Sequence, residues 1–161
     1  MIDSAALQAL EEIYALESTS VIRYLSLNSE VQVRDDFDRK VRAFFMDWYR
    51  ASDINRNAFL DLLESEGRIL STYSYPLKFS EYNYLNARYL LGPVVRLMGQ
   101  NLDSMSARLD RLNGWSRAAE LVNAVIDRQR PFIERAEELA AERESEAPTA
   151  PKSRGTSASR W

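Results

Sequence analysis

The sequence predicts an all-α protein: a four-helix bundle formed by residues 1–144, followed by a disordered tail at residues 145–161. In four long segments the apolar residues recur at alternating spacings of three and four, which places them on one face of a helix. A chain of 161 residues with 45% hydrophobic side chains can bury the core of one domain. From Ser145 onward Ser, Pro, Thr and Ala dominate, and such a composition buries too little apolar surface to offset the entropy of ordering.

The first expected helix covers residues 4–27. Ser4 is a suitable N-cap, and Asn28 and Ser29 are turn-forming residues that would end the helix. One member of the inner seam, Glu17, is acidic and therefore unusual for a core position. The seam consists of Leu7, Leu10, Tyr14, Glu17, Val21 and Tyr24.

The second expected helix covers residues 34–66 and has a clear polar stripe opposite its apolar face. Ser52 and Asn55 interrupt the apolar face midway along the helix. Gly67 follows as a C-terminal stop, because glycine readily adopts the left-handed conformation that ends helices. The apolar face consists of Val41, Phe44, Phe45, Trp48, Phe59, Leu62 and Leu63.

The segment 68–79 contains Tyr73, Tyr75 and Pro76 and has no helical periodicity, so we expect a connection there. A dozen residues span at most about 40 Å when fully extended. Such a length allows two topologies. The segment is either a crossover between two parallel helices or a long loop between antiparallel ones.

The third expected helix covers residues 80–113. Its seam keeps the spacing of three and four without a break, and Gly92-Pro93 lies inside it, where proline predicts a kink. The seam consists of Leu91, Val95, Met98, Leu102, Met105, Leu109 and Leu112.

The fourth expected helix follows Gly114 and continues to residue 144. Gln129 falls on its inner face, and Pro131 predicts a second kink. The apolar inner residues are Leu121, Val122, Val125, Phe132, Ala136 and Leu139.

The composition excludes several classes of function. The chain has no histidine and no cysteine, so no Ser–His or Cys–His pair and no disulfide can form. The 21 basic and 24 acidic residues are mixed along every segment, which gives no basic surface for nucleic acid. No stretch approaches the roughly 18 apolar residues of a membrane span, and the start of the chain does not resemble a signal peptide. We therefore expect a cytoplasmic protein that binds neither membrane nor nucleic acid.

Residues 17–24, Glu-Ser-Thr-Ser-Val-Ile-Arg-Tyr, resemble the first-helix motif of the ferritin-like superfamily. In that motif a metal-binding Glu precedes a Tyr by seven residues, as Glu17 precedes Tyr24. The lengths of the four segments and of the connection are similar to that superfamily as well. The resemblance implies a ferritin-like four-helix bundle with one inward Glu from each of two helices and a Glu-x-x-His motif from each of the other two.

Most of the ligands that this resemblance implies are missing. In the second helix the inner pair at the right spacing is Ser52 and Asn55, and the alternative frame gives Asp53 and Arg56. In the fourth helix the comparable frames are Ile126 with Gln129 and Asp127 with Arg130, and no carboxylate occurs between Leu90 and Leu102 in the third. Arginine cannot ligate a metal, and one Glu cannot hold two hard cations. We therefore predict no metal site, no catalytic residues and no cofactor.

A buried Glu17 carboxylate would need partners, because an unpaired buried charge is costly. Three hypotheses follow. Glu17 belongs to a polar layer that fixes helix register, it lines a pocket for a small ligand together with Tyr24, Asn55 and Gln129, or the seam is misplaced by one position and Glu17 lies at the surface. The candidate partners are the cations Arg56 and Arg88 and the neutral donors Tyr24, Ser52, Asn55 and Gln129.

The functional prediction is a ferritin-like bundle that has lost its di-metal centre and acts by protein–protein interaction, most simply as a homodimer or larger assembly. Aromatic residues expected at helix edges, Trp48, Tyr49, Tyr73 and Tyr75, support this hypothesis. One alternative is an iron-binding ferritin-like oxidase or storage protein with a carboxylate-only site. Another is a sensor bundle that binds a small ligand in its polar core.

Overall fold

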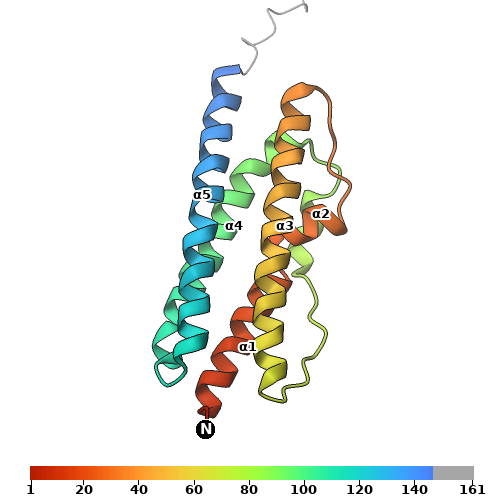
Figure 1. Ribbon diagram of the computed structural model, residues 1–161. Helices are drawn as coiled ribbons and strands as arrows, with labels where there is room; N and C mark the ends of the chain where they lie inside the picture. The colour runs from red at the N-terminus through yellow and green to blue at the C-terminus, as the bar shows by residue number, and fades with distance from the viewer. Residues whose placement is uncertain (147–161) are drawn as a thin grey trace, which may run out of the picture.

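A computed structural model describes residues 1–146, and helices joined by non-helical connections make up this part of the chain (Figure 1). The predicted disordered tail lies outside the described residues except for Ser145 and Glu146, which continue the last helix. The elements are α1 (Ser4–Ser18), α2 (Val21–Leu27), α3 (Asp36–Ser65), the 3₁₀ helix η1 (Leu77–Tyr82), α4 (Ala87–Ala107), the 3₁₀ helix η2 (Leu109–Leu112) and α5 (Ser116–Glu146). The all-α prediction is therefore confirmed for the described residues.

The two helices joined by the long connection, α3 and α4, run in the same direction (Figure 1). The backbone N–H of Arg88, at the start of α4, donates to Asp38 at the start of α3, over 3.0 Å. Lys40 in α3 pairs with Glu142 near the end of α5 at 2.8 Å, so α5 runs antiparallel to α3. Residues 66–86 therefore form a crossover that returns the chain along the length of α3, and the alternative of an antiparallel loop is wrong.

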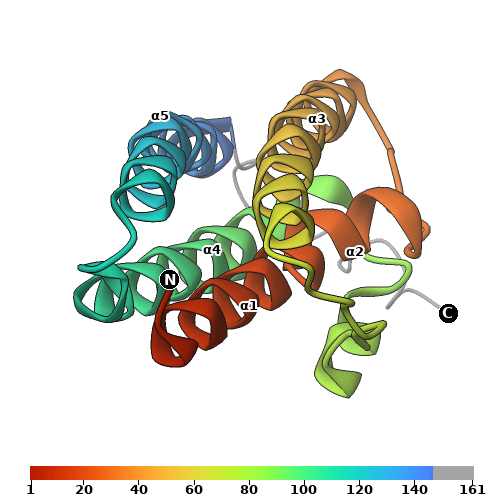
Figure 2. The same ribbon diagram turned by 60° about the horizontal axis from the view of Figure 1, so that its bottom comes forward.

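The longer helices α1, α3, α4 and α5 form the body of the molecule (Figure 2). In this view α1 and α4 lie side by side, and α3 and α5 lie together above them. The short helix α2 and the 3₁₀ helix η1 pack against each other at the outer side of α3. This arrangement leaves the crossover exposed to solvent on one side and packed against the bundle on the other.

The first expected helix is broken into α1 and α2 at Thr19 and Ser20. The Thr19 hydroxyl donates back to the carbonyl of Ala15 at 2.8 Å, and the Ser20 hydroxyl accepts from the N–H of Arg23 at 3.3 Å. Ser and Thr compete in this way with the helical hydrogen-bond ladder, so they favour helix ends. The run of three such residues at 18–20 explains the break that apolar periodicity did not predict.

The second expected helix is confirmed as α3. The Asp35 carboxylate caps its first turn by accepting from the N–H of Asp38 at 3.0 Å. Gly67 follows the last turn with φ of +76°, the left-handed conformation expected for a glycine stop.

The third helix begins at Ala87, seven residues later than predicted. Residues 77–82 are a 3₁₀ helix instead, and Tyr84 adopts φ of +68° in the turn that precedes α4. The helix α4 continues through Pro93, and α5 continues through Pro131. The kinks that we expected at these prolines stay predictions.

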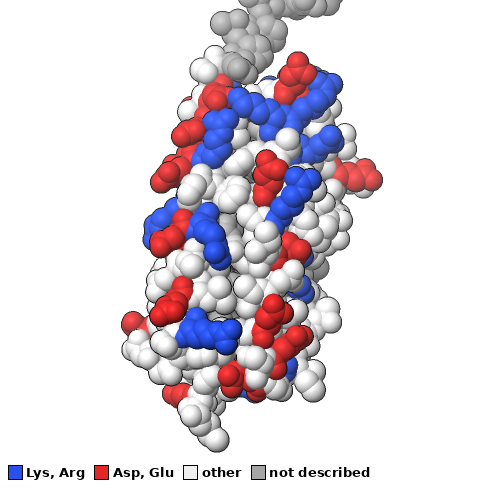
Figure 3. All heavy atoms as spheres, in the orientation of Figure 1, with Lys and Arg blue, Asp and Glu red and all other residues white. Residues whose placement is uncertain are grey.

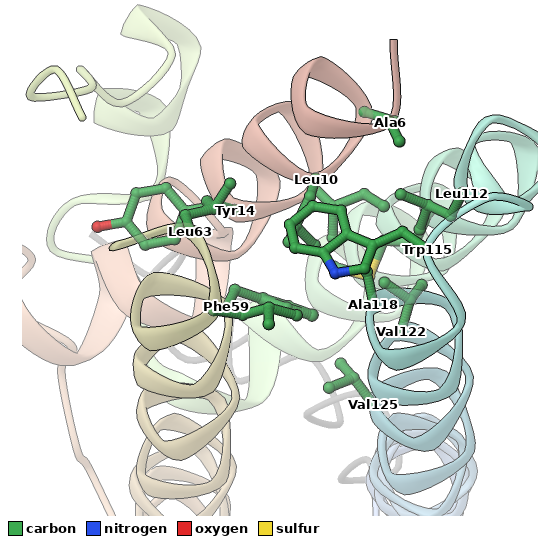
Figure 4. Close-up of a cluster of buried hydrophobic side chains, with 14 of the residues drawn as sticks. Ala6, Leu10, Tyr14, Phe59, Leu63, Leu112, Trp115, Ala118, Val122 and Val125 are labelled. Carbon is green, nitrogen blue, oxygen red and sulfur yellow. The ribbon is translucent and has the colours of Figure 1, made fainter. Parts of the chain in front are cut away.

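The core consists of two apolar clusters, one at each end of the bundle. The first cluster joins the start of α1, the end of α3 and the start of α5, with Leu10, Phe59 and Trp115 among its members (Figure 4). The second cluster joins α2, the start of α3, most of α4 and the later part of α5, around Phe45, Leu90 and Leu139. Between the two clusters lies a layer of buried polar side chains.

On the face drawn in Figure 3, acidic and basic side chains alternate without forming a continuous region of either sign. None of the helices in residues 1–146 combines the length and the apolar character that crossing a bilayer requires.

Candidate functional site

The buried polar layer at the middle of the bundle is centred on the Glu17 carboxylate. Glu17, Ser52 and Gln129 come from α1, α3 and α5, and each is at most 2% exposed. The Ser52 hydroxyl donates to Glu17 Oε1 at 2.5 Å, and the Gln129 amide donates to the same oxygen at 3.2 Å. Three helices are thus joined through one carboxylate oxygen, and the hypothesis that Glu17 lies at the surface is wrong.

Trp48 extends this layer by one further hydrogen bond. Its indole N–H donates to Gln129 Oε1 at 2.5 Å. Because indole nitrogen can only donate, the amide oxygen of Gln129 must face Trp48 and its NH₂ group must face Glu17. Trp48 is fully buried and stacks on Phe132, with ring centroids 5.5 Å apart. The predicted place of Trp48 on the apolar face of the second helix is therefore confirmed, and its assignment to an aromatic edge available for self-association is wrong.

Burial raises the pKa of the Glu17 carboxyl group from 4.5 to about 7. The hydrogen bond from Ser52, the positive charge of Arg23 and the hydrogen bond from Gln129 each oppose this rise, because they favour the ionised form. The loss of water around the buried carboxyl group raises the pKa by more than these three interactions lower it. Glu17 therefore changes its charge near neutral pH inside the bundle.

Two other predicted site residues, Asn55 and Tyr24, hydrogen-bond to partners outside the polar layer. Asn55 is buried one turn beyond Ser52 and accepts from Arg128 at 3.1 Å. The Tyr24 hydroxyl donates to Asn83 at 2.7 Å, in the crossover. Neither residue hydrogen-bonds to Glu17, so the polar layer is narrower than the predicted ligand pocket.

The two arginines expected to neutralise Glu17 pair elsewhere. Arg56 donates to the Ser18 hydroxyl at 3.2 Å, and its guanidinium lies 5.2 Å from the ring centre of Tyr14. Arg88 is paired with Asp35 and Asp38 at the end of the bundle. Neither forms an ion pair with Glu17.

The cation whose charge acts on Glu17 is Arg23, which sequence reasoning missed. Arg23 is 7% exposed, pairs with Asp53 at 2.6 Å and lies 5.3 Å from the ring centre of Tyr49. The expected continuous helix over residues 4–27 would place Arg23 elsewhere, because α2 points away from the axis of α1. The Ser–Thr–Ser run at residues 18–20 was the signal for that change of direction.

The residues of the layer do not fit a di-metal centre. Glu17 is the one carboxylate in it, and the groups that face this carboxylate are O–H and N–H donors. A hard cation needs several oxygen ligands, so these donors fit a carboxylate or a carboxylic acid and repel a metal ion. Within residues 1–146 no three His, Cys, Asp or Glu side chains come together as ligands for one ion.

Comparison of the chain with models of protein families, with curated proteins and with solved structures gives no match in any of the three.

Proposed function

We propose that the chain is a ferritin-like bundle in which a hydrogen-bonded polar layer has replaced the di-metal centre, and that it acts without catalysis through self-association. The supporting observation is the environment of Glu17, whose Oε1 accepts hydrogen bonds from the neutral groups of Ser52 and Gln129. The helix path supports the same proposal, because a single long crossover between parallel helices is typical of ferritin-like folds. A cytoplasmic homo-oligomer belongs to this proposal.

The surface that we assign to self-association is the crossover side of the molecule. Among residues 1–145, five of the eight exposed large hydrophobic residues lie between residues 69 and 89. Ile69 and Leu77 are 97% and 93% exposed, and Leu27 at the end of α2 is 52% exposed. Large apolar side chains exposed along one connection are candidates for a protein–protein contact. A second copy of the chain is the simplest partner that would bury them.

Light scattering coupled to gel filtration, over a wide range of concentration, tests this proposal on protein purified without a tag. We expect the mass of a dimer or larger assembly, and Leu77→Asp should shift that mass toward the monomer. Ile54→Asp is the matched control, because Ile54 is 69% exposed but lies on α3, outside the crossover. A monomer at every concentration would overturn the proposal.

The alternative of an iron-binding oxidase or storage protein requires a second carboxylate beside Glu17. Metal analysis of the same untagged protein distinguishes the two ideas. Iron in stoichiometric amount, lost on Glu17→Gln, would replace our proposal with the alternative.

A further inference from the structure

A groove of about 550 Å³ lies between the bundle and the crossover. Its walls are the junction of α1 and α2, the second half of α3 and residues 68–75. The volume is within the range of sites that bind small molecules. Glu17, Ser52 and Gln129 do not line it, so the groove is separate from the polar layer.

Three arginines from three different segments line this groove. They are Arg23, Arg56 and Arg68, and Glu64 is the one acidic residue of the lining. Three positive charges and one negative charge leave a net charge of +2 on the lining. Asp53 and Glu11 pair with Arg23 and Arg68 from outside the lining and offset part of this charge.

Two of these guanidinium groups have unused hydrogen-bonding capacity. Arg23 is 7% exposed, and its Nε–H is buried without a hydrogen-bond partner. Arg68 Nε lies 3.1 Å from Glu11, yet its geometry does not complete a hydrogen bond. Buried donors without partners are rare in proteins, and the Nε–H of Arg23 therefore indicates a missing acceptor. An oxyanion in the groove would be such an acceptor, because guanidinium binds carboxylate and phosphate oxygens with two parallel hydrogen bonds.

The crossover wall supplies further donors. Residues 69–75 form no backbone–backbone hydrogen bond with other described residues, so their N–H groups are free to bind water or a ligand. Ser71 and Thr72 place hydroxyl groups in the lining. Burial raises the pKa of Tyr73 and Tyr75, so both phenols keep their protons and can donate.

We propose that this groove binds a small polar molecule that carries a phosphate or carboxylate group, with the anion held by Arg23, Arg56 and Arg68. Both classes of ligand carry an oxyanion for the arginines, and hydroxyl groups on the ligand would hydrogen-bond to the polar side chains of residues 68–75. This inference goes beyond the proposed function, because an anion can bind here whatever the state of assembly of the chain.

Calorimetric titration of the full chain at low ionic strength tests the proposal with three probes: ribose 5-phosphate, citrate and uncharged ribose. We expect saturable binding of at least one of the two anions and none of ribose. Binding of ribose 5-phosphate alone would assign a phosphate site, and binding of citrate alone would assign a carboxylate site. Amide NMR shifts confined to residues 69–75 and their neighbours would place the anion in the groove.

Arg56→Gln removes one cation without stranding a buried acid, so this variant should fold. We expect its affinity for the anion to fall about tenfold, the effect of losing one charged hydrogen bond. Arg68→Gln should weaken binding in the same direction. The matched control is Arg50→Gln on the same helix, because Arg50 pairs with Asp47 and does not line the groove.

Three results would overturn the proposal. The first is no saturable heat with either anion, and the second is equal affinity in the wild type, Arg56→Gln and Arg68→Gln. The third is an equal loss of affinity in Arg50→Gln, which would show attraction to overall charge rather than to the groove. None of these results bears on the mass of the assembly, so the failure of this proposal and that of the proposed function are separable.

Discussion

At the scale of single residues, the most consequential position is Glu17. Its carboxyl group accepts hydrogen bonds on Oε1 from two neutral donors, and the remaining cost of burying its charge raises its pKa to about 7. The unfolded chain ionises this group near 4.5. Between these two values the folded protein holds a proton that the unfolded chain has released, so a rise in pH over this window favours unfolding.

We predict that Glu17→Gln removes this pH dependence. Glutamine has nearly the shape of the protonated acid and keeps a carbonyl oxygen for Ser52 and Gln129. The free energy of unfolding should match the wild type near pH 4 and exceed it near pH 8 by about 3 kcal/mol, which corresponds to the shift in pKa. Urea unfolding followed by circular dichroism at the two pH values measures the difference.

Glu17→Ala is the contrasting variant. It leaves the Ser52 hydroxyl and the Gln129 amide without an acceptor and opens a cavity, so it should destabilise at both pH values by about 2–4 kcal/mol. Parallel pH profiles for the wild type and Glu17→Gln would contradict the assignment of a titrating carboxyl group in the core.

At the scale of elements, the break between α1 and α2 determines the position of Arg23, the cation near the polar layer. Ser20 is 1% exposed, and its hydroxyl caps the first turn of α2. Because α2 leaves the direction of α1, Arg23 forms an ion pair with Asp53 of α3, whose side chain is 40% exposed. A helix that continued straight would point the same arginine elsewhere, so the local hydrogen bonds of Thr19 and Ser20 determine a contact across the bundle.

We predict that Ser20→Ala destabilises the protein by about 1 kcal/mol, the usual effect of losing an N-cap. Thermal unfolding followed by circular dichroism measures this loss. Ser106→Ala is the matched control, because Ser106 is exposed within α4 and alanine favours helix there. Equal stabilities for the two variants would show that Ser20 does not cap α2.

The sequence predicted some helix boundaries correctly and missed others. Long amphipathic segments predicted α3 and α5, and the conformational freedom of glycine predicted the stop at Gly67. The late start of α4 was missed, because residues 80–86 contain apolar and aromatic residues, yet residues 80–82 belong to the 3₁₀ helix η1 and residues 83–86 form a turn. Periodicity describes which face is buried, whereas caps and turns depend on competing hydrogen bonds of single side chains.

For the candidate site, the sequence predicted which residues are buried better than it predicted their hydrogen-bond partners. Glu17, Ser52 and Gln129 were predicted to share the interior, because each lies on the apolar face of its own helix. The partner of Gln129 was missed, because Trp48 was interpreted only as a member of an apolar face or an aromatic edge, and its indole N–H was not considered. Arg88 was assigned to Glu17 incorrectly, since its true partners become neighbours only when the direction of α4 is known.

At the scale of the whole molecule, the crossover requires α4 to begin beside the start of α3. Asp38, fully buried in α3, receives three hydrogen bonds there. Its Oδ1 accepts from the backbone N–H and the side-chain Nε of Arg88, each at 3.0 Å, and its Oδ2 accepts from the N–H of Arg34 at 2.9 Å. A backbone bridge between Gln32 and Asn86 lies next to this cluster. These contacts hold the parallel arrangement at the end of the bundle where both helices begin.

We predict that Asp38→Ala destabilises the whole fold by about 3 kcal/mol, because it strands three donors and leaves the Arg88 guanidinium with Asp35 alone. Urea unfolding at neutral pH measures the loss, with Asp36→Ala as the matched control. Asp36 is 99% exposed and pairs only within its own helix with Arg39, so its replacement should change stability little. An equal loss in both variants would mean that the crossover is held by apolar packing alone. A larger loss for Asp38→Ala, with the same cooperativity, would show that the hydrogen bonds of one buried carboxylate stabilise the junction where α3 and α4 begin side by side.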